Sequence, residues 1–217
     1  MLFSRSISFD DEEQVNAIGA APVSTVISAS EARFIEKLKE GDAEAFDRLV
    51  TLYSSDVFGL LFRLTGDKEE ASDLTQDTFL SALNAVKGFR GRSRIRTWLF
   101  RIAINHSRNR FRWWKRRQRD RTVSFEDAIG VSELRVHETI PAVGPDPEEN
   151  AVTSERERAL LNAVATLPTV FREAVVLCDV HGLSYEEISS VVGVGLGTVK
   201  SRIARGREEL RRKLKAY

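Results

Sequence analysis

Apolar residues recur at three- and four-residue steps through most of the chain, which is the spacing of one buried face on an α-helix. After Gly41, with Asp42 as a candidate N-cap, this spacing continues up to Gly66, which ends it. A second helix is expected in DKEEASDLTQDTFLSALNAV. Its expected buried side consists of Leu74, Phe79, Ala82, Leu83 and Val86. No segment shows the alternation of a β-strand, so the pattern predicts an all-α fold.

Two further helical blocks flank a segment in which the pattern fails. The first includes TWLFRIAINHSRNRFRWW, after the loop FRGRSR, and the second includes SERERALLNAVATLPTVFREAVVLCDV, with Pro168 opening a helix. Between them, GVSELRVHETIPAVGPDPEEN holds three of the five prolines, several acids and no sustained apolar face. We therefore expect two small helical domains, at 31–117 and 154–217, joined by a flexible acidic linker at 118–153. Residues 1–30 are expected to form a flexible tail.

The second domain has the pattern of a helix-turn-helix. Ser184 and Glu187 form a capping-box sequence that begins a short helix, and Gly193 ends it. After the turn GVGLG, a basic second helix is expected from about Thr198. The residues expected to face inward are Ile188, Val191, Val192, Val199, Ile203, Leu210 and Leu214. A second helix of this kind fits the major groove of DNA, and the alternative is an ordinary helical hairpin with a solvated basic face.

Other chemistry is weakly represented in the sequence. GVGLGT resembles a dinucleotide-binding glycine loop, but Thr198 replaces the third glycine and only nineteen residues follow, too few for a βαβ unit. The histidines His106, His137 and His181 stand alone, without metal-ligand spacing. We therefore expect no metal, no cofactor and no catalytic group, and we predict that the protein is not an enzyme.

A formal net charge of +1 hides four blocks of alternating sign. Residues 1–86 hold seven cations and sixteen acids, a net charge of −9, whereas 87–121 hold fourteen cations and one acid, a net charge of +13. The net charge is −6 over 122–171 and +3 over 172–217. A block at +13 repels itself unless a polyanion binds it, so nucleic acid is the expected partner.

Composition indicates the compartment. The single cysteine, Cys178, lies in the apolar run AVVLCDV, where we expect a small buried hydrophobe, and one thiol forms no internal disulfide. No stretch approaches the ~20 apolar residues that span a bilayer, and DDEE interrupts any signal-peptide core near the N-terminus. We therefore expect a cytoplasmic protein that does not insert into membranes.

Several motifs together resemble bacterial sigma factors of the extracytoplasmic-function (ECF) type, group 4 of the sigma-70 family. They are DLTQDTFL, FRGRSRIRTWLFRIAINHSRN, LPTVFREAVVL and LSYEEISSVVGVGLGTVKSRIARGREEL. The resemblance covers about 31–117 and 155–213. It implies an RNA polymerase subunit whose region 2 reads and melts the minus-ten promoter element and whose region 4 reads the minus-thirty-five element. The linker would occupy the polymerase's RNA exit path, and an anti-sigma factor would regulate the protein.

A stand-alone helix-turn-helix repressor or activator is the alternative. In that case 87–117 is only an auxiliary phosphate clamp. The face of DLTQDTFL argues against it, because a repressor has no use for a polymerase-binding surface.

The resemblance also implies three sets of site residues. Asp73, Gln76, Asp77 and Leu80 share one helical face, which would bind the clamp helices of the largest polymerase subunit. The residues expected at minus-ten DNA, as duplex and as melted non-template strand, are Phe89, Arg90, Ser93, Trp98, Arg101, Asn105, Arg108, Asn109 and Arg112. Those expected at minus-thirty-five DNA are Thr198, Lys200, Ser201, Arg202, Arg205 and Arg207.

The aromatic residues of the first domain receive separate roles. The loop from Phe89 to Ser93 resembles the family's pocket for an extruded base, and Trp98 can either pack in the core or stack on DNA. Trp113 and Trp114 cannot face the same way on one helix, so at least one is expected to pack at the domain edge.

Two features of the second domain depart from the family's pattern. Gly195 occupies a turn position where the family often has proline or a hydroxyl residue. Ala204 and Gly206 are expected to leave a slim recognition helix. Both departures concern the base preference rather than the mode of binding.

Overall fold

The computed structural model describes residues 29–121 and 159–215. Of the expected tail (1–30) and linker (118–153), residues 1–28 and 122–153 lie outside these ranges, whereas 29–30 and 118–121 are helical. Helices account for the regular structure of the described residues, with no strand among them, so the all-α prediction is confirmed.

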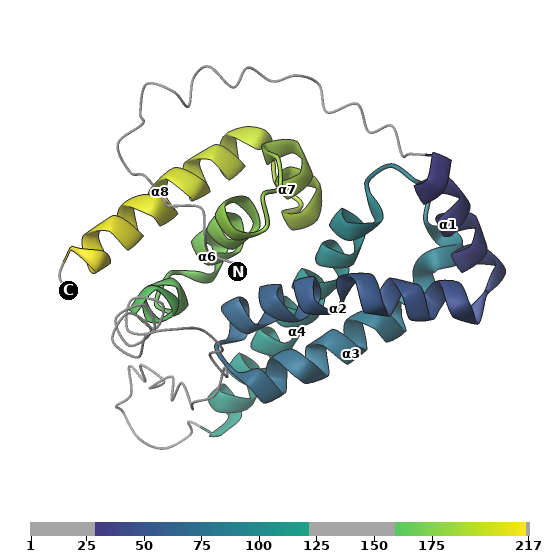
Figure 1. The fold of residues 1–217 in the computed structure, drawn as a ribbon. Coiled ribbons are helices and arrows are strands. Elements are labelled where there is room, and N and C mark those ends of the chain that lie inside the picture. Colours follow the sequence, from purple (N-terminus) through teal and green to yellow (C-terminus); the bar gives the residue numbers. More distant parts are fainter. Residues whose placement is uncertain (1–28, 122–158, 216–217) are drawn as a thin grey trace, which may run out of the picture.

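The N-terminal unit is a bundle in which α2, α3 and α4 pack against one another (Figure 1). Its elements are α1 (Ala29–Glu40), α2 (Ala43–Thr65), α3 (Lys68–Ala85), the 3-10 turn η1 (Val86–Gly88) and α4 (Ile95–Arg121). Asp42 caps α2 as predicted, since its side chain accepts a hydrogen bond from the amide of Ala45 at 3.2 Å. Gly66 ends α2 with a φ of 76°, a conformation that glycine adopts without strain.

The C-terminal unit holds the predicted helix-turn-helix. Residues 159–165 are helical, and α6 (Thr169–Val175), the π-helical turn η2 (Val176–Val180), α7 (Tyr185–Val192) and α8 (Leu196–Leu214) follow. The capping box is confirmed, because Ser184 and Glu187 exchange side-chain-to-backbone hydrogen bonds of 3.0 and 3.2 Å at the start of α7. Helix α8 begins at Leu196, two residues before the predicted start.

The two units pack against each other, chiefly through α4 and α7 (Figure 1). The ring of Phe100 on α4 is fully buried and meets the imidazole of His181 edge-on, at 4.8 Å between centroids. Nearby, the hydroxyl of Thr97 donates to the carboxylate of Glu187 at 3.0 Å. Arg172 on α6 donates to the carbonyl of Leu64 at the end of α2, at 2.6 Å. The C-terminal unit thus covers part of the first half of α4.

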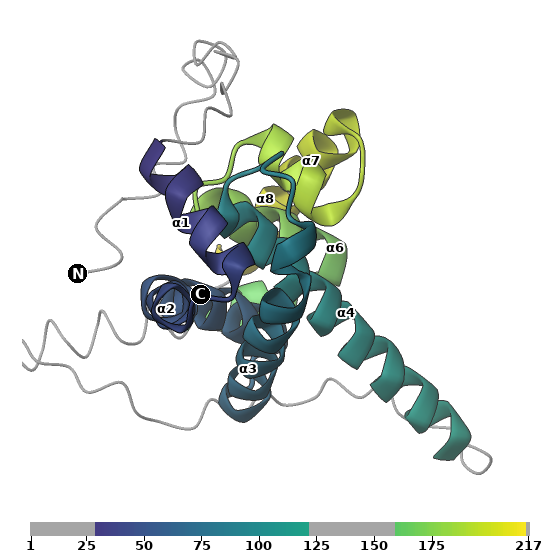
Figure 2. The ribbon, with the colours of Figure 1, turned by 90° about the vertical axis from the view of Figure 1, so that its right-hand side faces the viewer.

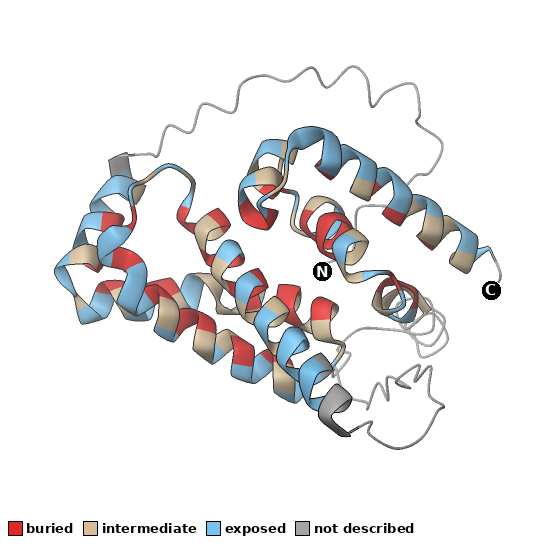
Figure 3. Ribbon diagram, turned by 180° about the vertical axis from the view of Figure 1, so that it is seen from behind, coloured by how far each residue is buried: buried red, intermediate tan, exposed pale blue. Residues whose placement is uncertain are grey.

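Burial follows the predicted helical faces with one exception (Figure 3). Leu74, Phe79, Ala82 and Val86 are buried as expected, whereas Leu83 is 42% exposed. The prediction was wrong for Leu83 because it lies one turn after Leu80, which is also exposed. Over the residues described, no helix is both long and apolar enough to span a membrane.

Candidate nucleic-acid interface

The acidic face of α3 lies in solvent. Asp73, Gln76 and Leu80 are exposed and Asp77 is half-buried, while the opposite side of the helix is buried. The start of α3 fixes this register, because Asp67 caps the helix and accepts a hydrogen bond from the amide of Glu70 at 2.8 Å. The structure therefore brings the four predicted residues onto one surface with two carboxylates and an apolar side chain.

The loop before α4 is held against the bundle by an aromatic contact. The ring of Phe89 is buried and packs on Trp98, with 5.0 Å between the ring centroids. Trp98 is half-buried, which favours the packing alternative for this residue. Arg90 is exposed and Ser93 is half-buried. Phe89 thus holds the loop in place rather than presenting its ring to solvent. Of the predicted contacts in this loop, Arg90 is accessible and Ser93 is accessible in part.

One side of α4 carries in solvent four of the six predicted minus-ten residues that lie on this helix. Arg101, Asn105, Asn109 and Arg112 are exposed, at steps of four, four and three residues. The Nη2 of Arg112 donates to the side-chain oxygen of Asn109. Two amides and two guanidinium groups in one row suit base edges and phosphates respectively.

Two hydrogen bonds orient α4 within the bundle. The carboxylate of Glu31 on α1 accepts from the amide of Ile95 at 3.2 Å, which caps α4 at its first residue. The imidazole Nε2 of His106 and the hydroxyl of Ser81 on α3 lie 2.8 Å apart. Neither contact was predicted, because each joins residues that are far apart in the sequence.

Arg108 turns away from this row and toward the C-terminal unit. Its guanidinium donates to both oxygens of the buried Glu173 carboxylate, at 2.8 and 2.5 Å, and to the carbonyl of Val192 at 3.2 Å. The hydrogen bond to Glu173 raises the pKa of Arg108. In this arrangement Arg108 is therefore separated from the other predicted minus-ten residues.

The outer face of α8 carries the predicted minus-thirty-five residues. Thr198, Lys200, Ser201 and Arg205 are exposed and Arg202 is half-buried, on the side away from the core (Figure 3). Arg207 differs, since it pairs with Asp179 at 2.6 and 3.2 Å, and this hydrogen bonding raises its pKa. Arg207 thus ties α8 to the end of η2, while the other residues are free to face a groove.

Gly206 has a packing role that its place in the sequence does not indicate. It is buried against α6, and a Cβ built at this position would lie 2.5 Å from Cγ2 of Val175. Its missing side chain therefore allows close packing of α8 on α6. Ala204 and Gly206 were expected to leave a slim recognition helix. Only Ala204 lies on the exposed face of α8, because Gly206 is buried.

The cysteine and the potential metal ligands show no sign of a reactive or metal-binding site. Cys178 is half-buried, and burial raises the pKa of its thiol to about 12, which keeps it protonated at neutral pH. No group of three or more potential metal ligands occurs in the part of the chain that the structure describes.

The far end of α4 departs from the prediction for its aromatic residues. Trp113 and Trp114 are both exposed, and they pack on each other at 5.6 Å between ring centroids rather than at a domain edge. The prediction was wrong because α4 extends beyond the bundle, to Arg121, where no other described element reaches these rings (Figure 2).

Comparisons with known proteins match both units. A family model described as Sigma-70 region 2 matches residues 49–120, and one described as Sigma-70, region 4 matches 157–210. The chain is 37% identical over 178 residues to the RNA polymerase sigma-H factor of Pseudomonas aeruginosa, covering 82% of this chain and 90% of that protein. It is 34% identical over 181 residues to the ECF RNA polymerase sigma factor SigW of Bacillus subtilis, covering 83% and 95% respectively.

A solved structure is also similar to this fold. It is the sigma factor RpoE in complex with the anti-sigma factor NepR from Bartonella quintana, with a TM-score of 0.63 and 25% identity. The match covers 80% of this chain and 98% of that chain.

Proposed function

The chain belongs to the sigma-70 family of RNA polymerase sigma factors, in its ECF group, and we propose which of its surfaces perform each step of promoter-specific initiation. The face of Asp73, Gln76, Asp77 and Leu80 binds the clamp helices of the largest core subunit. The loop before α4 and the exposed row on α4 bind minus-ten DNA. The outer face of α8 reads the minus-thirty-five element.

One observation carries the assignment of the core-binding face. Two acids, an amide and a leucine share an exposed surface on α3, and no described element of this chain covers it. Two carboxylates one helical turn apart suit a basic partner. The exposed leucine adds an apolar contact of the kind found inside protein interfaces. A stand-alone repressor would gain nothing from this surface.

The two DNA-binding surfaces have different chemistry, and this supports a division of labour. Helix α8 presents Lys200, Ser201 and Arg205 on a helix-turn-helix, which suits base edges in the major groove of a duplex. Helix α4 presents Asn105 and Asn109 with arginines beside them, which suits an unpaired strand held by its phosphates while its bases are read. Opening of the promoter is assisted because the strand is held in its unpaired state.

We also propose a regulator, a location and a class. The similarity to a sigma factor solved with its anti-sigma factor supports regulation of this chain by an anti-sigma protein. A polymerase subunit acts where polymerase acts, so its expected location is the cytoplasm. The protein contributes specificity rather than bond chemistry, so it is not an enzyme.

Binding of promoter fragments with and without core polymerase tests the proposal. The purified chain is titrated onto a promoter fragment and onto a scrambled fragment at near-physiological salt. We expect little sequence-specific binding by the chain alone and strong specific binding with core. The acidic blocks on both sides of 87–121 can compete with DNA phosphates for the basic surface until core engages the protein.

A repressor gives the opposite pattern. It must find its operator unaided, so nanomolar promoter-specific binding by the chain alone, unchanged by core, would overturn the sigma assignment.

A further inference from the structure

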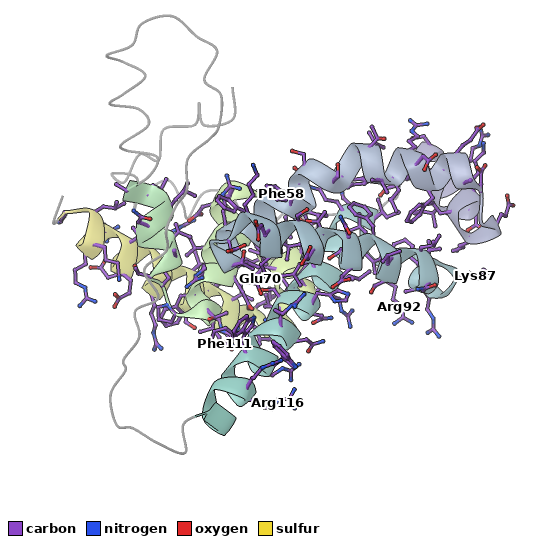
Figure 4. All side chains as sticks on the ribbon, turned by 90° about the horizontal axis from the view of Figure 1, so that it is seen from below. Phe58, Glu70, Lys87, Arg92, Phe111 and Arg116 are labelled. Carbon is purple, nitrogen blue, oxygen red and sulfur yellow. The ribbon has the colours of Figure 1, made fainter. Side chains whose placement is uncertain are left out.

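The projecting end of α4 carries three large aromatic side chains in solvent. Phe111 is 58% exposed, Trp113 is 42% exposed and Trp114 is 50% exposed. Figure 2 shows this half of the helix extending away from both units, and Figure 4 shows Phe111 and Arg116 on it. Large apolar side chains clustered in solvent are typical of an interaction surface.

The two tryptophan rings contact each other in a defined geometry. Their rings meet edge-to-face, with an angle of 84° between the ring planes, and the guanidinium of Arg117 lies 5.0 Å from the centroid of the Trp113 ring. These contacts restrict the rings before any ligand arrives, which lowers the entropy lost on binding.

The surroundings of the pair are cationic. Arg112, Arg116 and Arg117 are all exposed, and the sequence contains no acid between Lys87 and Arg119. A ligand for this surface therefore carries negative charge and also offers flat apolar faces. The phosphates of a duplex would contact only the arginines. Unpaired nucleotides would contact the arginines through their phosphates and the aromatic rings through their bases.

The position of the pair matches the proposed path of the melted strand. Trp113 follows Asn109 by four residues, so it lies on the same side of α4, about one turn or roughly 6 Å further along. Phe111 is off the side of Asn109 and Trp113 but lies one turn before Trp114, so it borders the pair.

We propose that one ring of the Trp113–Trp114 pair stacks an unpaired base of the promoter while the other ring supports it edge-on, with Arg112, Arg116 and Arg117 binding the neighbouring phosphates. The inference rests on the proposed function, and it extends the strand-binding surface of α4 beyond the two asparagines. Stacking tolerates any base, so the pair stabilises the open promoter without contributing to sequence preference.

Fluorescence anisotropy with labelled oligothymidylate tests the proposal on the full chain. The variants are the double substitution W113A/W114A, the conservative double substitution W113F/W114F, and L52A, which removes a large exposed side chain from α2, as the matched control. We expect W113A/W114A to weaken binding roughly five- to 150-fold, the range for one stacked base. W113F/W114F retains most of the affinity because phenylalanine also stacks, and L52A binds as the unaltered chain does. A paired oligonucleotide of equal length is bound equally by all four proteins.

Each other outcome contradicts the proposal. Unchanged binding of oligothymidylate by W113A/W114A would overturn it. An equal loss on paired and unpaired DNA would show a surface for duplex phosphates instead. Loss of co-purification with core, with oligothymidylate binding intact, would show a docking surface for a protein.

Failure of the proposed function is recognised separately. It would appear as an inability of the unaltered chain to direct core to a promoter.

Discussion

The guanidinium of Arg108 on α4 and the carboxylate of Glu173 on α6 form two parallel hydrogen bonds, of 2.8 and 2.5 Å, across the boundary between the two units. Glu173 is buried, so its charge depends on this partner. A bidentate pair of this kind is among the stronger polar contacts in proteins. Arg108 cannot bind Glu173 and a DNA phosphate through the same nitrogens, so DNA binding by Arg108 requires the units to separate.

Substitution of Arg108 with alanine is expected to open the packed arrangement. It leaves the Glu173 carboxylate buried without its cation, which typically costs about 3–5 kcal/mol. Small-angle X-ray scattering of the purified chain should then show a larger radius of gyration.

The matched control is R110A, because Arg110 pairs with Glu70 at 4.0 Å wholly within the N-terminal unit. We expect R110A to scatter as the unaltered chain does. Identical scattering by R108A and the unaltered chain would contradict the role of the pair.

Charge reversal on α3 is expected to abolish association with core polymerase. In D73R/D77R two arginines would face a basic partner, while helix content should stay nearly unchanged, because exposed substitutions rarely change stability by more than ~0.5 kcal/mol. Co-purification with core, alongside circular dichroism, measures both quantities. D47R, at an exposed position on α2, is the control and should bind core normally. If D73R/D77R still co-purified with core in normal yield, the assignment of this face would be wrong.

Two alanine substitutions should separate the promoter elements. Arg205→Ala is expected to lower transcription most on promoters with the preferred minus-thirty-five bases. The loss of a bidentate base contact corresponds to about 1–3 kcal/mol of binding free energy. Asn105→Ala should change the minus-ten preference instead, because Asn105 lies on α4. In vitro transcription from a set of single-base promoter variants measures both preferences. Equal losses on every promoter would argue against base reading by these side chains.

Gly206→Ala is expected to destabilise the C-terminal unit. Its Cβ would overlap the Val175 side chain, and overpacking of this kind costs about 1–3 kcal/mol. Urea unfolding of the chain should show a lower midpoint. The double variant G206A/V175A removes the overlapping methyl groups and should recover part of the loss. A single variant as stable as the unaltered chain would show that α6 and α8 can move apart freely.

The packed arrangement should weaken in acid because of His181. Burial, reinforced by the nearby Arg96, lowers the pKa of this imidazole to about 4, whereas an exposed histidine has a pKa near 6.5. Between these values the state that exposes His181 binds the extra proton, so stability falls as pH decreases from about 6.5 to about 4, by at most about 1.4 kcal/mol per pH unit. Above this range the residue makes no pH-dependent contribution.

Comparison with His181→Asn isolates this contribution from that of the carboxylates. The unfolding free energy of each protein is measured across this range, and the variant should show the shallower slope. Equal slopes would exclude His181 as the source.

Features that depend on local sequence were predicted well. The capping box at Ser184 follows from residues three positions apart, and the solvent face of Asp73 and Gln76 follows from helical periodicity. Each requires only knowledge of one helix. The all-α architecture followed for the same reason.

Features that depend on contacts between distant segments were missed. Glu173 and Arg108 are 65 residues apart, and nothing near either one indicates a partner. Leu83 has the spacing of a buried residue, but whether another helix covers it is decided by packing. Gly206 is similar, since its neighbour Val175 belongs to another helix.

The close packing at Gly206 has a consequence for how promoter specificity can change over evolution. Inward contacts at Val199, Ile203, Gly206 and Leu210 fix the position and tilt of α8, and these residues are buried away from its exposed face. The exposed positions on the other side of the helix carry no such packing constraint. If α8 reads the promoter as proposed, new base preferences can be acquired at the exposed positions one substitution at a time, while the position of the helix and the fold stay the same.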